Sequence, residues 1–469
     1  MIPWDLQNMT AYVVFLAFFV TAYYVAGKGL EATFLNVWVP IFLCIPFVFT
    51  AHIPMVPIRT FAQASIVPLI FVLCREKWHQ LRLGRMEVLI ILYVILRVSM
   101  DYTSRGYKDA QNYAFYMLSC LVGPYLLGCY VINSKRMDVK TIGRFVLIFL
   151  LFFPMFLYET KFYVSPIYKI MSPLFPDAFS GLSIRWGMAR TAGTFEHPIL
   201  ACIMIIAVYR LHRWLTWTGE WRLQQQGLLG KIQSWCKPLP FKFETQISIV
   251  LIIMALMTIS RGPWIGAIAA AILVGAGNMK NRKRALAIVL GLFLMGGLLG
   301  KMALDAYITP AEGQAMAAEA QTMLYRKVMV ERYTEFLMDR MWTGWGLTTV
   351  PTIKGMESID NAFFLMALQH GVLAPVLFVV IFIYAIVTQI LLGLKSPAGS
   401  APLGFTFSGI YLMCFFAFTT VYMGAQTEPL LFLLLGWGEG IKARKPEVSS
   451  GNQDTVQAAP EFRFRRVLR

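Results

Sequence analysis

Apolar runs repeat along almost the whole chain, and their length is what most limits the possible fold. Most contain about 15–23 residues, close to the ~20 that a helix needs to cross the hydrocarbon core of a bilayer. They are continuously apolar rather than alternating, which excludes a transmembrane β-barrel. The sequence therefore predicts an all-α polytopic membrane protein.

Hydropathy predicts about 12–13 transmembrane helices and a long external loop that contains amphipathic helices. The expected spans lie near residues 10–27, 33–51, 60–74, 86–100, 113–132, 142–158, 195–212, 245–260, 263–279, 285–303, 372–394, 403–422 and 428–441. Four prolines interrupt the region from 40 to 57, so one of the first spans is expected to be broken or re-entrant. We expect a single transmembrane domain over 1–441, followed by a polar, disordered cytoplasmic tail over 442–469.

The formal net charge of +17 follows membrane topology and does not indicate a nucleic-acid partner. Lys and Arg gather on alternate loops, so that all of these loops fall on one side of the membrane. The positive-inside rule makes this side the cytoplasm, which also holds the C-terminus. The basic loops lie at 75–85, 135–144, 210–242, 280–284, 395 and 442–445.

Three polar pieces fall on the opposite, external side: 159–197, the turn at 260–263, and the long loop 304–371. Each carries at least one arginine, although the topology rule leaves outer loops poor in this residue. Charge placed against that bias indicates a function. A fourth piece, 101–112, has nearly balanced charge and is predicted to be a plain solvated loop.

The first external piece carries Arg185 and Arg190 and ends at Glu196-His197-Pro198, directly before a span. Pro198 suits the first turn of a helix. Free N–H groups of that turn, together with Arg190, would favour an anion. The alternative is that Arg190 only anchors the helix at the lipid headgroups.

The second external piece places Arg261 in a tight hairpin, before Gly262 and Pro263. A lone arginine at the interface is commonly a headgroup anchor. A functional role becomes the better interpretation if the side chain points inward beside Arg190.

The third external piece is predicted to form an amphipathic helix from Met323 to Met341, lying flat on the outer surface. The simpler interpretation of its charges is a solvated face. A turn at 344–346 ends this helix. A second short helix is expected to begin at Asp360-Asn361, with Asp360 a plausible N-cap, and to close at His370.

The external residues include several arginines and few carboxylates, without a Cys/His cluster or an acidic metal pair. This set fits chemistry in which arginines neutralise a diphosphate and one carboxylate or imidazole accepts a proton. It does not fit hydrolysis by a bound metal. We therefore expect neither a metal nor another cofactor.

In their order along the chain, these motifs resemble the O-antigen ligase/polymerase superfamily. The resemblance covers about 160–395. The motifs are Arg190 followed by Gly193-Thr194-Phe195 and His197-Pro198, then Ser260-Arg261-Gly262, then Arg326 before Gly344-Trp345-Gly346, and then Asp360-Asn361 with Gly371.

The resemblance implies an integral membrane glycosyltransferase of the bacterial inner membrane, with its catalytic face in the periplasm. Its partners would be a donor oligosaccharide linked to undecaprenyl diphosphate, a glycan or lipid-linked acceptor, and membrane lipids. A ligase transfers the chain to lipid A-core or to another glycan or protein. A polymerase transfers it to the next repeat unit. The family is described as using no nucleotide sugar and no metal.

The family's residues carry over to matching positions of this chain. Arg190 and Arg261 match arginines thought to hold the diphosphate, and Arg326 matches one that positions donor or acceptor. Asp360 stands where ligases usually have His, while the following Asn361 matches. The departure favours a polymerase, with Asp360 as base. Glu196 and His197 are the less favoured bases, and His370 is a supporting residue near a common Glu position.

A lipid-linked sugar transporter or flippase is the alternative from another class. It predicts ionisable residues at mid-span and broken helices along a path between two halves. Arg97 is the main mid-span charge in the sequence, and no internal repeat is evident.

Overall fold

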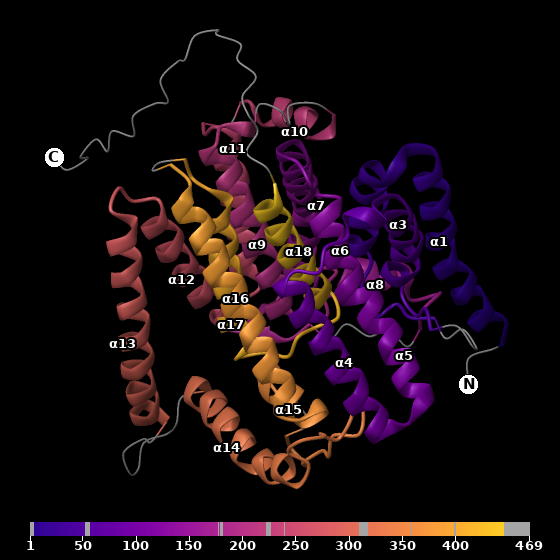
Figure 1. Cartoon of the computed structure of the whole chain (residues 1–469), viewed down its shortest axis with the longest axis vertical. Coiled ribbons are helices and arrows are strands. Elements are labelled where there is room, and N and C mark those ends of the chain that lie inside the picture. Colours follow the sequence, from indigo (N-terminus) through magenta and orange to yellow (C-terminus); the bar gives the residue numbers. More distant parts are fainter. Residues whose placement is uncertain are drawn as a thin grey trace.

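Figure 1 shows the computed structural model as a bundle of helices, which confirms the all-α polytopic membrane fold. The structure describes residues 4–51, 57–176, 178, 182–221, 227–238, 240–308, 318–356, 358–397 and 400–444. The predicted disordered tail lies almost wholly outside these residues. By length and composition, the described part holds 5 helices able to cross a membrane, at Tyr12–Cys44, Tyr107–Tyr130, Lys135–Phe162, Pro198–Trp217 and Leu373–Lys395. Shorter apolar helices lie at Phe243–Met257, Arg261–Gly277 and Leu403–Phe418.

The elements follow the expected spans closely. In the first half they are α1 (Trp4–Thr33), a π-helical turn (Phe34–Trp38), α2 (Val39–Cys44), α3 (Phe61–Lys77), a 3-10 turn (Trp78–Gln80), α4 (Arg85–Arg105), α5 (Tyr107–Met117), a second π-helical turn (Leu118–Val122), α6 (Gly123–Tyr130), α7 (Lys135–Phe162), α8 (Pro166–Met171), and the two-stranded antiparallel ribbon of β1 (Ile184–Arg185) and β2 (Met188–Ala189). In the second half they are α9 (Pro198–Trp217), α10 (Leu228–Cys236), α11 (Phe243–Met257), α12 (Arg261–Gly277), α13 (Arg282–Ile308), α14 (Ala318–Asp339), α15 (Ala362–His370), α16 (Leu373–Lys395), α17 (Leu403–Phe418) and α18 (Thr427–Ala443).

The chain reverses direction inside α1, at Gly29. This residue has φ 80° and ψ 176°, which no helix contains and which glycine adopts without strain. Val14, from the first part of α1, packs in the same buried cluster as Phe49 and Phe61, which follow α2. A straight helix would hold these residues tens of ångströms apart, at about 1.5 Å per residue. The two separate spans expected at 10–27 and 33–51 are therefore two antiparallel segments.

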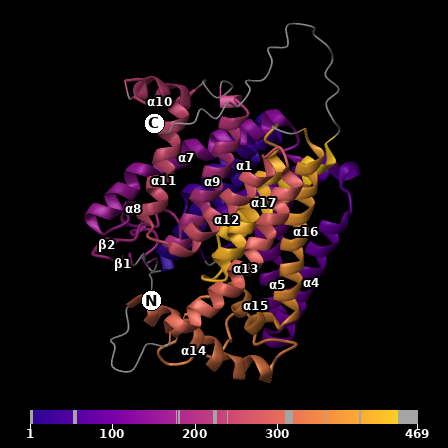
Figure 2. The same cartoon turned by 90° about the vertical axis from the view of Figure 1, so that its left-hand side faces the viewer.

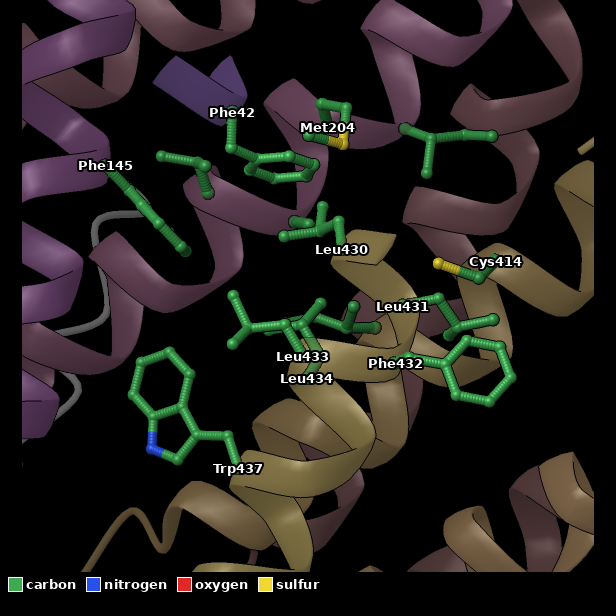
Figure 3. Close-up of a cluster of buried hydrophobic side chains, with 14 of the residues drawn as sticks. Phe42, Phe145, Met204, Cys414, Leu430, Leu431, Phe432, Leu433, Leu434 and Trp437 are labelled. Carbon is green, nitrogen blue, oxygen red and sulfur yellow. The ribbon is translucent and has the colours of Figure 1, made fainter. Parts of the chain in front are cut away.

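Helix α18 is buried, and its central residues form part of a large apolar cluster (Figure 3). Leu430, Phe432 and Leu434 on it are at most 3% exposed, as expected of a helix surrounded by other helices. Its contact with α6 is made through Gly436, where an added Cβ would lie 1.9 Å from the carbonyl oxygen of Tyr125. Small residues allow such close helix contact in membranes.

The described part of the long polar piece, residues 318–356 and 358–371, is folded onto one end of the bundle. Figures 1 and 2 show α14 lying across that end, far from α10. Met329 and Tyr333 on the inner face of α14 are at most 1% exposed and pack with Ile359 and Leu368. The Tyr333 hydroxyl also donates to the carbonyl of Met356 at 2.9 Å. The expected amphipathic helix is present, and its apolar side covers a small core of its own.

The prediction of a solvated loop at 101–112 is wrong. Helix α4 continues to Arg105, and α5 begins after a single residue, Gly106, at φ 85°. Asp101 is fully buried, where its carboxylate accepts from Arg105 at 3.3 Å and from the backbone N–H of Leu347 at 3.1 Å. The nearly balanced charges are therefore internal partners of one another and of the segment after α14.

Candidate active site

The first two external pieces lie against each other. The N–H of Thr191 donates to the carbonyl of Met257 at 3.3 Å, across the hairpin between α11 and α12. The Arg190 side chain is 7% exposed and donates to the Thr258 carbonyl and to the Ser260 hydroxyl, both at 3.2 Å. Arg190 is therefore held inside the protein at this junction. A side chain that only anchors a helix at the lipid headgroups would lie at the surface instead.

Glu159, near the end of α7, holds the loop that carries Arg190 and His197. Its Oε2 accepts from the N–H groups of Ala192 and Gly193, each at 3.0 Å. Gly193 has φ 63°, and a Cβ there would lie 2.6 Å from the Phe156 ring. The amides at 192 and 193 are thus bound to a carboxylate of the protein itself. They are not available to an outside anion.

His197 caps the N-terminus of α9, and Pro198 occupies the first turn as predicted. The Nδ1 atom of His197 accepts from the N–H of Ile199 at 3.1 Å. The expectation of free N–H groups in this turn is therefore wrong for Ile199. Burial, followed by the charge on Arg190, lowers the pKa of His197 to about 4, so the ring is neutral at neutral pH.

The third external piece reaches the site through the loop between α17 and α18. Arg326 on α14 donates from Nη2 to the Thr420 carbonyl at 3.1 Å, while its buried Nε has no partner among the described residues. The N–H of Ala362 donates to the Val421 carbonyl at 3.0 Å. This short loop, which carries no arginine and no carboxylate, was missed as part of the site.

Asp360 is not the N-cap of α15. Asn361 has that position, and its Oδ1 accepts from the N–H of Phe364 at 3.1 Å. Asp360 is half-buried and accepts from the Ser358 hydroxyl at 2.6 Å. Asp360 therefore precedes the cap residue, and its carboxylate lies outside the helix, where it can contact a substrate.

Arg185, Arg190 and Arg326 are hereafter the arginine cluster. The charge of Asp360 acts on Arg190 and on Arg326, and the charge of Arg185 acts on both of these arginines. Burial, then the charge on Arg185, lowers the pKa of Arg190 to about 10, and Asp360 opposes this change. Burial also lowers the pKa of Arg326, with Asp360 opposing and Arg185 adding to the shift. Two of the guanidinium groups thus interact with one carboxylate, and the third repels both. A bound anion would relieve both the repulsion and the lost hydration.

Arg261 lies at the rim of this site. Its guanidinium stacks over the Trp186 ring at 4.9 Å, on the turn of the β1–β2 ribbon. Arg185, the residue of β1 directly before Trp186, donates to the Ile259 carbonyl at 3.4 Å. Arg185, which the sequence placed second to Arg261, is the arginine whose charge acts most strongly on Arg190.

His370 belongs to a different group of side chains. It is fully buried, and its Nε2 lies 3.1 Å from the Tyr113 hydroxyl. Burial, then the charges on Arg97 and Arg105, lowers the pKa of His370 well below its ordinary value. Among the described residues, no contact links His370 to Asp360, so its expected supporting role stays a prediction.

A cavity of about 430 Å³, hereafter the polar cavity for the charged side chains in its lining, reaches the neighbourhood of His197. Glu196 and Tyr422 line it, and the Tyr422 ring packs edge-on to His197 with the ring centres 6.2 Å apart. Burial raises the pKa of Glu196 and raises that of Tyr422 to about 12. Within the described residues, no group of three His, Cys, Asp or Glu side chains is placed to hold a metal ion.

We expect Glu159→Ala to destabilise the protein more than Glu159→Gln. The alanine leaves two buried N–H groups without an acceptor, at about 1–3 kcal/mol each, whereas glutamine keeps one acceptor oxygen. Thermal unfolding of the purified protein in detergent measures the difference. Glu331→Ala, at an exposed carboxylate on α14, is the control and should leave the midpoint unchanged. Equal midpoints for wild type and Glu159→Ala would contradict this role.

We expect acid to destabilise the protein partly through His197. Its folded pKa of about 4 lies below the ordinary value of 6.5, so the unfolded chain binds the proton first. The contribution is complete above pH 6.5 and is lost as the pH falls toward 4. It is worth at most about 3 kcal/mol. In His197→Asn, which keeps an N-cap acceptor, the loss in thermal midpoint between pH 7.5 and 4.5 should be smaller. An unchanged loss would contradict the prediction.

The fold defines a polytopic membrane protein in which Arg190 and Arg326, from separate external pieces, are both largely buried. Residues 246–379 match a family model described as O-antigen ligase, which supports assigning the chain to the O-antigen ligase superfamily. At family level, this match supports a membrane glycosyltransferase of the ligase or polymerase type. The matched segment contains Arg261, Arg326, Asp360 and Asn361, whereas Arg185 and Arg190 precede it. No curated protein matched the chain.

Proposed function

We propose that the protein transfers a glycan from undecaprenyl diphosphate to an acceptor hydroxyl at the periplasmic face of the bacterial inner membrane. The observation that carries the proposal is the convergence of the arginine cluster on Asp360 from segments far apart in the chain. The basic loops, assigned to the cytoplasm by the positive-inside rule, support the outward orientation of this site.

The arginine cluster suits the diphosphate of the donor. Arg190 and Arg326 are both mostly buried, and their positive charges are crowded by Arg185. Guanidinium groups bind phosphate oxygens through paired, charge-assisted hydrogen bonds. Such bonds strengthen as negative charge builds on the leaving group, which lowers the barrier to its departure. Arg261, stacked on Trp186 at the rim, is placed to meet the donor as it enters.

The proposed reaction is a displacement at the anomeric carbon. The acceptor oxygen forms a bond to that carbon while the bond from carbon to the diphosphate oxygen breaks. The electron pair leaves with undecaprenyl diphosphate, and the acceptor proton passes to a base. Asp360 is the proposed base because it lies outside the α15 cap and beside the arginine cluster. Glu196, whose pKa is raised by burial, and His197 are the alternatives.

Asp360 occupies the position where ligases usually carry His, which favours a polymerase over a ligase. The glycans of a strain that lacks the gene decide between the two. Loss of a polymerase leaves single repeat units on the carrier or on the core. Loss of a ligase leaves full-length chains on the carrier. A strain whose envelope glycans are unchanged would overturn the proposal.

The transporter alternative depends on Arg97 as a mid-span charge along a translocation path. Arg97 is paired instead, with its Nη1 2.9 Å from Oε1 of Glu428, and the Tyr93 hydroxyl accepts from the same nitrogen at 2.9 Å. A direct test is Arg261→Ala at normal expression. Loss of glycan extension while carrier-linked units still reach the outer face excludes a flippase.

A further inference from the structure

The polar cavity is lined by none of the residues of the arginine cluster. It lies between α4, α5, α15 and the start of α18, close to the α14 end of the bundle. Its volume of about 430 Å³ falls within the roughly 300–1,000 Å³ of small-molecule sites. Arg97 lines the cavity, and His370 lies behind its wall, against Tyr113. The proposed reaction uses neither residue.

The charges that line this cavity are balanced. The lining contains the guanidinium groups of Arg59, Arg97 and Arg105 and the carboxylates of Asp109, Glu196 and Glu428. Two of these arginines are already in ion pairs, Arg97 with Glu428 at 2.9 Å and Arg105 with Asp109 at 3.2 Å. The arginine cluster has three mutually repelling cations and only the carboxylate of Asp360 to offset them, and so favours an anion. The polar cavity favours a ligand that is polar and uncharged.

Hydrogen-bonding groups and aromatic rings alternate on the cavity wall. Tyr113 and Tyr116 are nearly parallel, with ring centres 6.0 Å apart, and the Tyr116 hydroxyl donates to Glu428 at 2.8 Å. Asn112 and Gln369 add amide groups. Arg97 is 5% exposed, and its buried Nε has no partner among the described residues. Amides, ion-paired side chains and ring faces suit the hydroxyl groups and C–H faces of a sugar.

The cavity meets the reaction site at Glu196 and Tyr422. Both line the cavity, and both are neighbours of His197, one along the chain and one through its ring. The charge on Asp360 also acts on Tyr422. A saccharide in the cavity would therefore have its end at Glu196 and Tyr422 near Asp360.

We propose that the polar cavity binds the acceptor, as an uncharged, hydroxyl-rich saccharide, while the arginine cluster binds the donor diphosphate. The role of this saccharide as the acceptor rests on the proposed function, whereas its binding in the polar cavity does not. Its acceptor hydroxyl forms the new bond to the anomeric carbon, and its proton goes to the base already named.

The test measures binding first. The probe is the cell's own envelope polysaccharide, cut to labelled single repeat units by mild acid and titrated onto the purified protein in nanodiscs. Asn112→Trp, which fills the cavity, should weaken binding by about tenfold or more. Its neighbour Gln111 is exposed and does not line the cavity, so Gln111→Trp should bind as the wild type does. Equal binding by wild type and Asn112→Trp would overturn the proposal.

Kinetics then separate acceptor from donor. In transfer assays Asn112→Trp should raise KM for the acceptor and leave KM for the lipid-linked donor unchanged. A rise in donor KM alone, or an equal rise in both, would overturn the assignment. If the wild type binds the saccharide but transfers nothing, the proposed function fails while the binding site stands. If transfer proceeds unchanged in Asn112→Trp, the proposed function stands and the assignment of the polar cavity to the acceptor fails.

Discussion

Replacing Arg326 by alanine is expected to reduce glycan transfer by about 10²–10³-fold, the usual effect of removing one donor to a developing charge. The side chain is mostly buried between α14 and the loop before α18, and its Nη2 bond to the Thr420 carbonyl fixes it beside Asp360. The loss should appear mainly in kcat, because the diphosphate gains most of its charge as it leaves. Initial rates in nanodiscs, with varied donor, measure both constants.

The matched control for Arg326 lies on the same helix. Arg332 is exposed, and Arg332→Ala should transfer at the wild-type rate. Arg326→Lys should recover only part of the activity, because an ammonium group cannot make the paired bonds of a guanidinium. Equal losses in Arg326→Ala and Arg332→Ala would mean that α14 contributes charge in general and holds no particular residue at the site.

Replacing Asp360 by asparagine is expected to reduce transfer by about 10²–10⁴-fold, the range for loss of a general base. The substitution keeps the size of the side chain and an oxygen that can accept from the Ser358 hydroxyl. The cap of α15 is made by Asn361 and is unaffected, so the protein should fold and express normally. Activity of the variant against pH, measured beside the wild type, is the relevant assay.

Two variants make the result on Asp360 specific. Asp339→Asn, at an exposed carboxylate near the end of α14, should retain full activity. Glu196→Gln should retain more activity than Asp360→Asn if Asp360 is the base. The opposite order would transfer the role to Glu196, which lines the polar cavity.

Much of the architecture followed from hydropathy, because a helix that crosses a bilayer must be apolar over a fixed length. The same rule located the three arginine-bearing outer pieces. It could not show which arginines share a site. Arg190 and Arg326 are each held in part by a backbone carbonyl, that of Thr258 in the hairpin and that of Thr420 in the loop. Because every residue has a backbone carbonyl, a hydrogen bond to one cannot be predicted from residue type.

The errors have local physical causes. Aspartate and asparagine are equally good N-caps, so the pair Asp360-Asn361 does not reveal which residue caps α15. Glu159 stands just after the predicted end of a span and looks solvated in the sequence, yet its carboxylate is buried against two N–H groups. Arg97 looks like an isolated mid-span charge because its partner, Glu428, lies 331 positions away in the chain.

The most direct test of the account is a cryo-EM structure of the protein in nanodiscs with a lipid diphosphate-linked saccharide bound. The account predicts the diphosphate between Arg190 and Arg326, with its oxygens about 2.7–2.9 Å from guanidinium nitrogens, and the anomeric carbon facing Asp360. A diphosphate bound in the polar cavity against Arg97 and Arg105, or on the outer surface away from Arg190 and Arg326, would contradict it.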